Sequence, residues 1–240
     1  MEKSTSHTRV NDILLGPLER PALKWLASRM PNWVTPDIMT GLGVVASILI
    51  FVSYWLSTYD SNFLWLASFG FILNWFGDSL DGNLARYRHI ERPKYGYFID
   101  HTVDAFSELM IGLGIGLSPY VRFDIALMAL IGYMLMSVYV YITTYVIGVF
   151  RISFSKIGPT EFRLMLILAN TIIYFVGNPL VELPIGTVTI YDALGIVVAI
   201  TLFILFIIST ITQAIELSKI EAAANTHSIP DEVEENIPKI

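Results

Sequence analysis

Long apolar stretches, separated by short polar segments, dominate the hydropathy pattern along this chain. About 20 predominantly apolar residues are enough to cross the hydrocarbon core of a bilayer as a helix. Six stretches are about this long, at residues 37–56, 62–82, 96–118, 124–150, 161–177 and 190–216. The pattern therefore predicts an all-α integral membrane protein with six transmembrane helices.

Ahead of the first apolar stretch, residues 9–30 mix apolar side chains with four basic ones. Trp25 lies among these basic residues, and tryptophan beside lysine and arginine favours the headgroup layer of a membrane. We therefore expect an N-terminal interfacial amphipathic helix, broken near Pro21 because proline disrupts a helix interior. The alternative interpretation is a disordered cytoplasmic leader.

The two polar ends and the apolar centre divide the chain into three parts. We expect a cytoplasmic leader with the interfacial helix at residues 1–35, a six-helix transmembrane domain at 36–217 and a polar cytoplasmic tail at 218–240. The tail shows no periodic apolar face, so it is predicted to be mobile.

The distribution of basic residues predicts the orientation in the membrane. With six spans, both ends lie on one side, and fourteen of the 15 lysines and arginines fall on that side, with only Arg122 opposite. The positive-inside rule makes the majority side cytoplasmic. The net charge of −6 says little about partners, because eight acids are concentrated in one motif and in the tail.

Composition agrees with a membrane protein and limits its metal chemistry. The chain is 54% hydrophobic and 15% charged, with a mean hydropathy of +0.60. Cysteine is absent, so any metal ion must be held by oxygen or imidazole ligands. The sequence contains no internal repeat, which gives no support to an inverted-repeat transporter.

Four aspartates stand at fixed spacings where the sequence is otherwise apolar. Asp78 and Asp81 are three residues apart, and Asp100 and Asp104 are four apart, so each pair shares one helix face. Because a charge at the bilayer centre costs at least ~2.5–3.5 kcal/mol, such acids persist where they bind a cation or line a water-filled cavity. Two facing helices would present four carboxylates to hard divalent cations such as Mg²⁺. The alternative is four independent helix-end acids that reach the interface.

Small residues accompany these aspartates. Gly82, Ala85 and Gly96 would let a flat or phosphate-bearing ligand approach the backbone, and Arg86 offers a donor fork suited to phosphate oxygens. Taken singly, each small residue is also typical of ordinary helix packing in a membrane.

Together these positions resemble a known family. Asp78-x2-Asp81-Gly82-x2-Ala85-Arg86-x9-Gly96-x3-Asp100-x3-Asp104 is similar to the complete signature of the CDP-alcohol phosphotransferase family. Pro36-Asp37-x2-Thr40 resembles the Pro-Asn-x2-Thr at the start of the family's first span, although Asp37 replaces the usual asparagine and makes this neighbourhood more acidic. Gly158-Pro159-Thr160-Glu161-x-Arg163 resembles a motif of the choline and ethanolamine phosphotransferase branch.

The resemblance implies an enzyme of phospholipid synthesis that transfers a phosphoalcohol group from a CDP-alcohol to an acceptor alcohol and releases CMP. It implies two divalent cations, Mg²⁺ or Mn²⁺, held by the four aspartates, with Asp104 as the general base. It also implies a homodimer. The basic loop between the two aspartate pairs predicts that the active site lies at the cytoplasmic face. The nucleotide would be bound by Thr40, Asp78, Asp81, Gly82, Ala85, Arg86 and Gly96. Donor and acceptor stay open between CDP-diacylglycerol with a small polar alcohol and CDP-choline or CDP-ethanolamine with a lipid alcohol.

Other polar residues allow two readings each. Arg151, Lys156, Glu161 and Arg163 are candidates for an acceptor-binding pocket. The positive-inside rule alone would explain the three cations. Glu108 continues the row of Asp100 and Asp104 by one turn, so it extends the polar cavity or pairs across a helix interface. His101 points about 100° away from Asp100 on a helix, which favours packing over metal binding.

An ion- or proton-coupled transporter is the main alternative function, because intramembrane acids also mark translocation paths. A transporter places its site near the bilayer midplane, whereas these acids cluster at one leaflet's depth beside a basic loop. A catalytically silent scaffold is disfavoured because every position of the signature is present.

Overall fold

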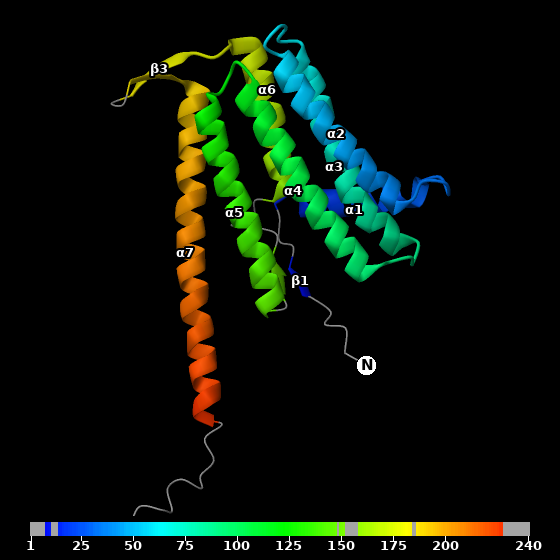
Figure 1. The fold of residues 1–240 in the computed structure, drawn as a ribbon. Coiled ribbons are helices and arrows are strands. Elements are labelled where there is room, and N and C mark those ends of the chain that lie inside the picture. The colour runs from blue at the N-terminus through cyan, green and yellow to red at the C-terminus, as the bar shows by residue number, and fades with distance from the viewer. Residues whose placement is uncertain (1–7, 11–13, 148, 152–157, 184–185, 228–240) are drawn as a thin grey trace, which may run out of the picture.

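The computed structural model describes residues 8–10, 14–147, 149–151, 158–183 and 186–227 (Figure 1). Within these residues the helices are α1 (Gly16–Arg29), α2 (Pro36–Leu56), α3 (Phe63–Tyr87), α4 (Pro93–Leu117), α5 (Phe123–Ile147), α6 (Pro159–Val176) and α7 (Ile190–His227). The strands are β1 (Thr8–Val10), β2 (Val149–Arg151), β3 (Leu180–Leu183) and β4 (Gly186–Thr189). Strand β1 pairs with β2 in parallel, and β3 pairs with β4 in antiparallel fashion.

Each of the six predicted apolar stretches coincides with one helix, from α2 to α7. By length and composition, α2, α5, α6 and the Ile190–Ala222 part of α7 are apolar enough to cross a membrane. Polar side chains, including the four aspartates, lower the hydropathy of α3 and α4, which fall outside this set. The structure therefore agrees with an all-α multi-pass membrane protein, and the number of six spans stays a prediction.

Several boundaries differ from the prediction. Helix α3 continues to Tyr87, and α5 ends at Ile147, so that residues 149–151 lie in strand β2. Helix α7 continues to His227, so residues 218–227 of the predicted tail are helical. These residues include three alanines, and alanine is the strongest helix former even without an apolar face. The rest of the predicted tail lies outside the described residues.

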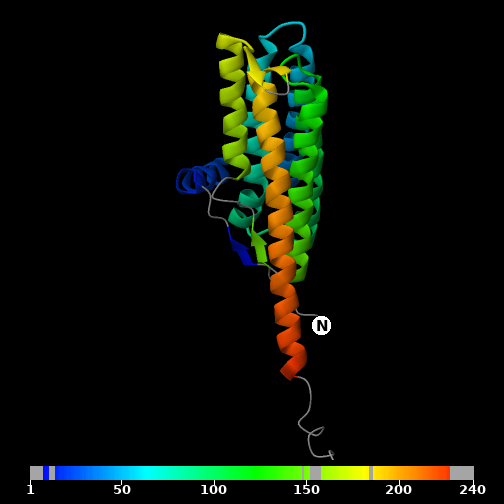
Figure 2. The same ribbon diagram turned by 90° about the vertical axis from the view of Figure 1, so that its left-hand side faces the viewer.

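Helix α1 also departs from the prediction, because it runs through Pro21 without a break. Proline inside a helix costs about 3 kcal/mol through a lost hydrogen bond and a steric clash. The helix continues beyond it because Leu23 and Ala27 are buried against Leu80 and Leu84 of α3. Figure 2 shows that α1 lies crosswise to the long helices, beside the end of α6 that comes first in the chain.

Close contacts of glycine fix the two aspartate-bearing helices on a common partner, α2. A Cβ atom at Gly77 of α3 would lie 2.6 Å from the carbonyl oxygen of Met39 and 2.7 Å from the nitrogen of Gly43. A Cβ atom at Gly114 of α4 would lie 2.9 Å from the Cα of Phe51. Both contacts involve backbone atoms of α2, which cannot move aside as a side chain can. Helix α3 is thereby held near the start of α2 and α4 near its end, and Figure 1 shows the three helices side by side.

Polar side chains link the helices at the end of the bundle remote from α1. The hydroxyl of Tyr54 on α2 donates to Oδ1 of Asn170 on α6 at 2.8 Å. Nδ2 of Asn170 donates to the hydroxyl of Ser68 on α3 at 3.1 Å. Hydrogen bonds between transmembrane helices contribute about 0.6 kcal/mol on average. This link therefore holds α6 on α2 and α3 at the end away from the aspartates.

Candidate functional site

A cavity of about 960 Å³ is bounded by α1, the first turns of α2, the end of α3, the start of α4 and the start of α6. A second, narrow space of about 10 Å³, roughly the room for one water molecule, shares Thr40 with it as a lining residue. All four predicted aspartates line both spaces: Asp78, Asp81, Asp100 and Asp104. Two facing helices thus bring the four carboxyl groups to one cavity.

The residues predicted to bind a nucleotide line the same cavity: Thr40, Gly82, Ala85, Arg86 and Gly96. At Gly96 a Cβ atom would meet no other protein atom within 4 Å, so the space beside it is open. At Gly82 a Cβ atom would lie 3.4 Å from the guanidinium of Arg86. The space is therefore open beside Gly96, whereas the guanidinium of Arg86 lies beside Gly82.

Neighbouring side chains orient the two aspartates of α3. The hydroxyl of Thr40 donates to Oδ2 of Asp81 at 2.6 Å. Arg163 of α6 donates from Nη2 to Oδ2 of Asp78 at 2.7 Å and from Nε to Oδ1 of Asn74 at 2.9 Å. Asn74 in turn donates to the carbonyl oxygen of Gly43 at 3.0 Å. A carboxylate has about four lone-pair positions, so both aspartates keep acceptor capacity for a further ligand.

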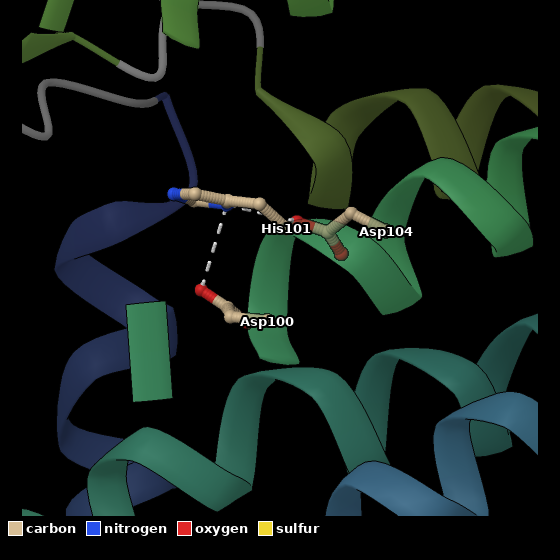
Figure 3. A group of neighbouring side chains, drawn as sticks. All are labelled: Asp100, His101 and Asp104. Atoms are coloured by element: carbon tan, nitrogen blue, oxygen red, sulfur yellow. Dashed lines mark ion pairs between the residues drawn. The ribbon is translucent and has the colours of Figure 1, made fainter. Parts of the chain in front are cut away.

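Asp100, His101 and Asp104 of α4 form the tightest cluster (Figure 3). Their potential ligand atoms lie within 4.8 Å of one another. Nδ1 of His101 is 3.9 Å from Oδ2 of Asp100 and 3.8 Å from Oδ2 of Asp104. The imidazole also stacks on Tyr141 at 4.8 Å and meets Tyr97 edge-on at 4.2 Å. His101 therefore packs against aromatic rings and also turns Nδ1 toward the two carboxylates. This nitrogen lies closer to them than expected from the angle of about 100° between His101 and Asp100 around the helix.

Glu108 lies apart from this cavity. Its Oε1 accepts a hydrogen bond from the hydroxyl of Ser137 on α5 at 2.9 Å, while Oε2 is buried without a partner among the described residues. Glu108 is not among the residues that line the cavity. Of its two predicted roles, the structure favours the pairing across a helix interface.

The four candidates for an acceptor pocket lie in different surroundings. Arg163 lines the cavity. Glu161 does not line it, because Oε1 accepts from the backbone nitrogen of Leu15 at 2.8 Å and Oε2 from that of Gly158 at 2.9 Å. Any contact of Glu161 with an acceptor would therefore require these hydrogen bonds to break. The backbone of Arg151 lies in β2, and Lys156 lies outside the described residues.

The cavity mouth contains an ion pair that involves Asp37. The guanidinium of Arg92 donates to Oδ1 of Asp37, and about half of each side chain is exposed. Arg92 also lies over the ring of Tyr95, with Cζ 4.2 Å from its centroid. The acid that departs from the family pattern is thus balanced by a cation from the loop before α4.

Sequence reasoning missed two polar residues of this site, Asn74 and Glu19. Asn74 stands one helical turn before Asp78 in an apolar stretch, and this isolated polar position was a usable signal. Glu19 lies in the leader among other charged residues, so the sequence offers no comparable signal. In the structure Glu19 lines the cavity and accepts hydrogen bonds from α3 and α6.

Comparisons with known proteins agree with the predicted family. Residues 33–217 match the model of the CDP-alcohol phosphatidyltransferase family. Phosphatidylinositol phosphate synthase of Cutibacterium acnes is 36% identical over 86 residues, which cover 35% of this chain and 38% of that protein. Archaetidylinositol phosphate synthase of Pyrococcus horikoshii is 35% identical over 116 residues, 48% of this chain and 56% of that protein.

A vertebrate relative is also similar. Cholinephosphotransferase 1 of Danio rerio is 26% identical over 165 residues, which cover 64% of this chain and 41% of that protein. The matched stretches span from 38% to 56% of the length of these three relatives. The family model, in contrast, extends from the start of α2 through most of α7. This chain belongs to the CDP-alcohol phosphatidyltransferase family.

Proposed function

We propose that this protein is a membrane-embedded enzyme of phospholipid synthesis. It transfers a phosphoalcohol group from a CDP-alcohol to an acceptor alcohol and releases CMP. The observation that carries this proposal is the convergence of four aspartates from α3 and α4 on one cavity, beside open backbone at Gly96. The family and the names of the relatives support it.

The donor set of the cavity fits divalent cations. Carboxylate oxygens are the ligands that Mg²⁺ and Mn²⁺ prefer, and part of each carboxyl group remains available. Two cations would be held by Asp78, Asp81, Asp100 and Asp104, and they would neutralise the diphosphate and stabilise the departing CMP. His101 stands within reach of the same atoms as a further candidate ligand.

The side chains of the chain then perform three tasks. Asp104 accepts the proton of the acceptor hydroxyl as that oxygen bonds to the β-phosphorus and the bond from this phosphorus to the bridging oxygen of CMP breaks. General base catalysis of this kind contributes typically ~10²–10⁴-fold in rate. Arg163 and Thr40 hold Asp78 and Asp81 in fixed orientations. Gly82, Ala85 and Gly96 admit the cytidine and its phosphates, with the guanidinium of Arg86 beside them.

The acceptor approaches the aspartates from the wall formed by α1 and α6. Arg163 lies there, and Arg151 and Lys156 belong to the segment just before α6. A lipid alcohol would reach this wall from the membrane and a polar alcohol from the aqueous mouth of the cavity. Product analysis distinguishes the two substrate pairs.

In the membrane, six helices from α2 to α7 span the bilayer and the cavity faces the cytoplasm. The basic loop between α3 and α4 supports this orientation under the positive-inside rule. Helix α1 lies in the interface, where Leu18 and Trp25 are largely exposed and Cζ of Arg29 lies 5.2 Å from the centroid of the Trp25 ring. The functional unit is a homodimer.

The experiment that tests this function is incubation of the purified protein in nanodiscs with a panel of CDP-alcohols and acceptors. We expect CMP and one new phospholipid, identified by mass spectrometry, only when Mg²⁺ or Mn²⁺ is present. A transporter would bind or move ions but would produce no CMP. Absence of CMP from every donor tested would contradict the proposed function.

The ion pair at the cavity mouth leads to a second prediction. Asp37→Asn removes a negative charge beside the entry path of an anionic CDP-alcohol and releases Arg92, so we expect KM for the donor to fall. Arg92→Gln leaves Asp37 unbalanced, so KM should rise. An exposed pair contributes about 0.2–1 kcal/mol, which corresponds to changes of roughly 1.4- to 5-fold.

Steady-state kinetics at two salt concentrations checks this prediction. The double variant Asp37→Asn with Arg92→Gln restores neutrality and should behave like the wild type. The KM shifts of the two single variants should shrink at high salt, because exposed charges are screened. A change of KM in the same direction in both single variants would show that the pair acts through structure and not through charge.

A further inference from the structure

Two acidic side chains join helices α1 and α6, which are far apart in the sequence. Oε1 of Glu19, in the first turn of α1, accepts from the hydroxyl of Thr160 at 2.9 Å. Oε1 of Glu161, in the first turn of α6, accepts from the backbone nitrogen of Leu15 at 2.8 Å. A glutamate at the start of each helix thus accepts a hydrogen bond from the start of the other helix. Figure 2 shows that these two helix starts lie next to each other.

Glu19 also binds α3. The same Oε1 accepts from Nε1 of Trp75 at 2.7 Å and from the hydroxyl of Ser79 at 3.4 Å. One carboxylate oxygen of α1 therefore accepts hydrogen bonds from side chains of both α3 and α6. Hydrogen bonds to an ionised acceptor are roughly twice as strong as those between neutral groups. Glu19, Ser79 and Thr160 all line the cavity, so this junction forms part of its wall.

The junction lies beside the contact between α6 and the aspartates. Arg163, one turn after Thr160, holds Asp78 and Asn74 on α3. On α3, Asn74 and Asp78 are one turn apart, and Trp75 and Ser79 follow them by one position each, about 100° further around the helix. Arg163 thus binds one face of α3, while Glu19 ties the start of α6 to the neighbouring face.

We propose that Glu19 is a positioning residue for the metal site, a role that rests on the proposed function. Its carboxylate fixes the start of α6 on α3, and this keeps the guanidinium of Arg163 on Asp78. Through Glu19, the crosswise helix α1 becomes part of the catalytic structure as well as a membrane anchor.

The sign of the effect on metal binding separates positioning from a purely structural role. An arginine beside a carboxylate lowers the affinity of that carboxylate for a proton by roughly 10-fold or more, and the direction is the same for a metal ion. If Arg163 leaves Asp78, Mn²⁺ should bind more tightly while turnover falls, because Asp78 is no longer held in place. A general loosening of the fold would weaken Mn²⁺ binding instead.

The test compares Glu19→Ala with Glu19→Gln in the full-length protein in nanodiscs. Both variants lose the negative charge, but only glutamine keeps an oxygen that accepts from Thr160 and Trp75. We expect Glu19→Ala to bind Mn²⁺ at least roughly 3-fold more tightly than Glu19→Gln and to have the lower kcat. In an Arg163→Gln background this difference in Mn²⁺ affinity should disappear, since residues that act through one contact are not additive.

Two further variants complete the design. Asn170→Ala cuts the link between α6 and α3 at the remote end, so it should lower Tm without changing Mn²⁺ affinity by more than about 2-fold. Thr160→Val removes only the α6 donor and, measured against Thr160→Ser, should tighten Mn²⁺ binding as Glu19→Ala does. If Glu19→Ala does not fold, the Mn²⁺ affinities of Thr160→Val and Thr160→Ser are compared instead.

Three results would overturn the inference. These are equal Mn²⁺ affinity in the alanine and glutamine variants, weaker binding in the alanine variant, or a difference that persists without Arg163. If Thr160→Val and Thr160→Ser also bind alike, α6 is held by other contacts. Failure of the wild type to bind Mn²⁺ would instead contradict the metal site on which the proposed function depends, together with this inference.

Discussion

Asp100→Asn is expected to abolish CMP release while the protein remains inserted and folded. The substitution removes the charge of a proposed metal ligand but almost none of its volume. Changes in residues that merely support metal ligands typically cost about 10- to 100-fold in metal affinity, so loss of a direct ligand should cost more than about 100-fold. Calorimetric titration with Mn²⁺ and an assay at saturating Mg²⁺ check both parts of this prediction.

Asp78→Asn should also abolish activity, but this variant is expected to lower the stability of the fold as well. Arg163 is only 12% exposed and donates to Asp78, so removal of that charge leaves a largely buried guanidinium without its anionic partner. Breaking a buried ion pair from one side costs about 3–5 kcal/mol, which would lower the stability of the fold. The double variant Asp78→Asn with Arg163→Gln should regain thermal stability without regaining activity. Full activity of both Asp100→Asn and Asp78→Asn would rule out the metal site as drawn.

Asp104→Asn is expected to reduce turnover severely and yet retain more CDP-alcohol binding than Asp78→Asn or Asp100→Asn. If Asp104 acts chiefly as the base, its loss removes proton transfer, an effect of typically ~10²–10⁴-fold. The other three aspartates line the cavity independently of Asp104 and can still hold a cation. Calorimetric titration of a CDP-alcohol with Mg²⁺ into each variant provides the comparison.

Complete loss of nucleotide binding in Asp104→Asn would show that Asp104 is mainly a metal ligand. The base would then have to be sought elsewhere. Glu108 is poorly placed for this role, because it does not line the cavity and one of its oxygens is bound to Ser137 of α5. A metal-activated hydroxyl group of the acceptor would be the remaining route for proton loss.

The sequence predicted the features of this protein that depend on local spacing. Apolar stretches predicted the six helices α2 to α7, because a helix in lipid must satisfy its own backbone hydrogen bonds, although α7 continues to His227 instead of ending at residue 216. The intervals between Asp78 and Asp81 and between Asp100 and Asp104 predicted which carboxylates share a helix face. The sequence alone did not show why all four line one cavity. In the structure α3 and α4 both pack on α2, and this common partner brings the two pairs of aspartates together.

Features that depend on contacts between distant segments could not be read in the same way. Pro21 suggested a broken helix, but burial of Leu23 and Ala27 on α3 outweighs the local preference. Arg92 could have paired with several acids, and only the fold shows that its partner is Asp37. Glu19 lies in a polar segment where every charged residue looks alike. Its importance comes from three donors on two other helices, none of which is near it in the sequence.

The central claim is that the four aspartates of α3 and α4 together hold the divalent cations that engage the donor nucleotide. Anomalous diffraction from crystals grown with Mn²⁺ and CMP tests it most directly. We expect anomalous peaks about 2.0–2.6 Å from carboxylate oxygens of both helices, with a phosphate oxygen of CMP on the same ions. Peaks confined to Asp100, His101 and Asp104, or CMP bound away from the aspartates, would contradict this claim.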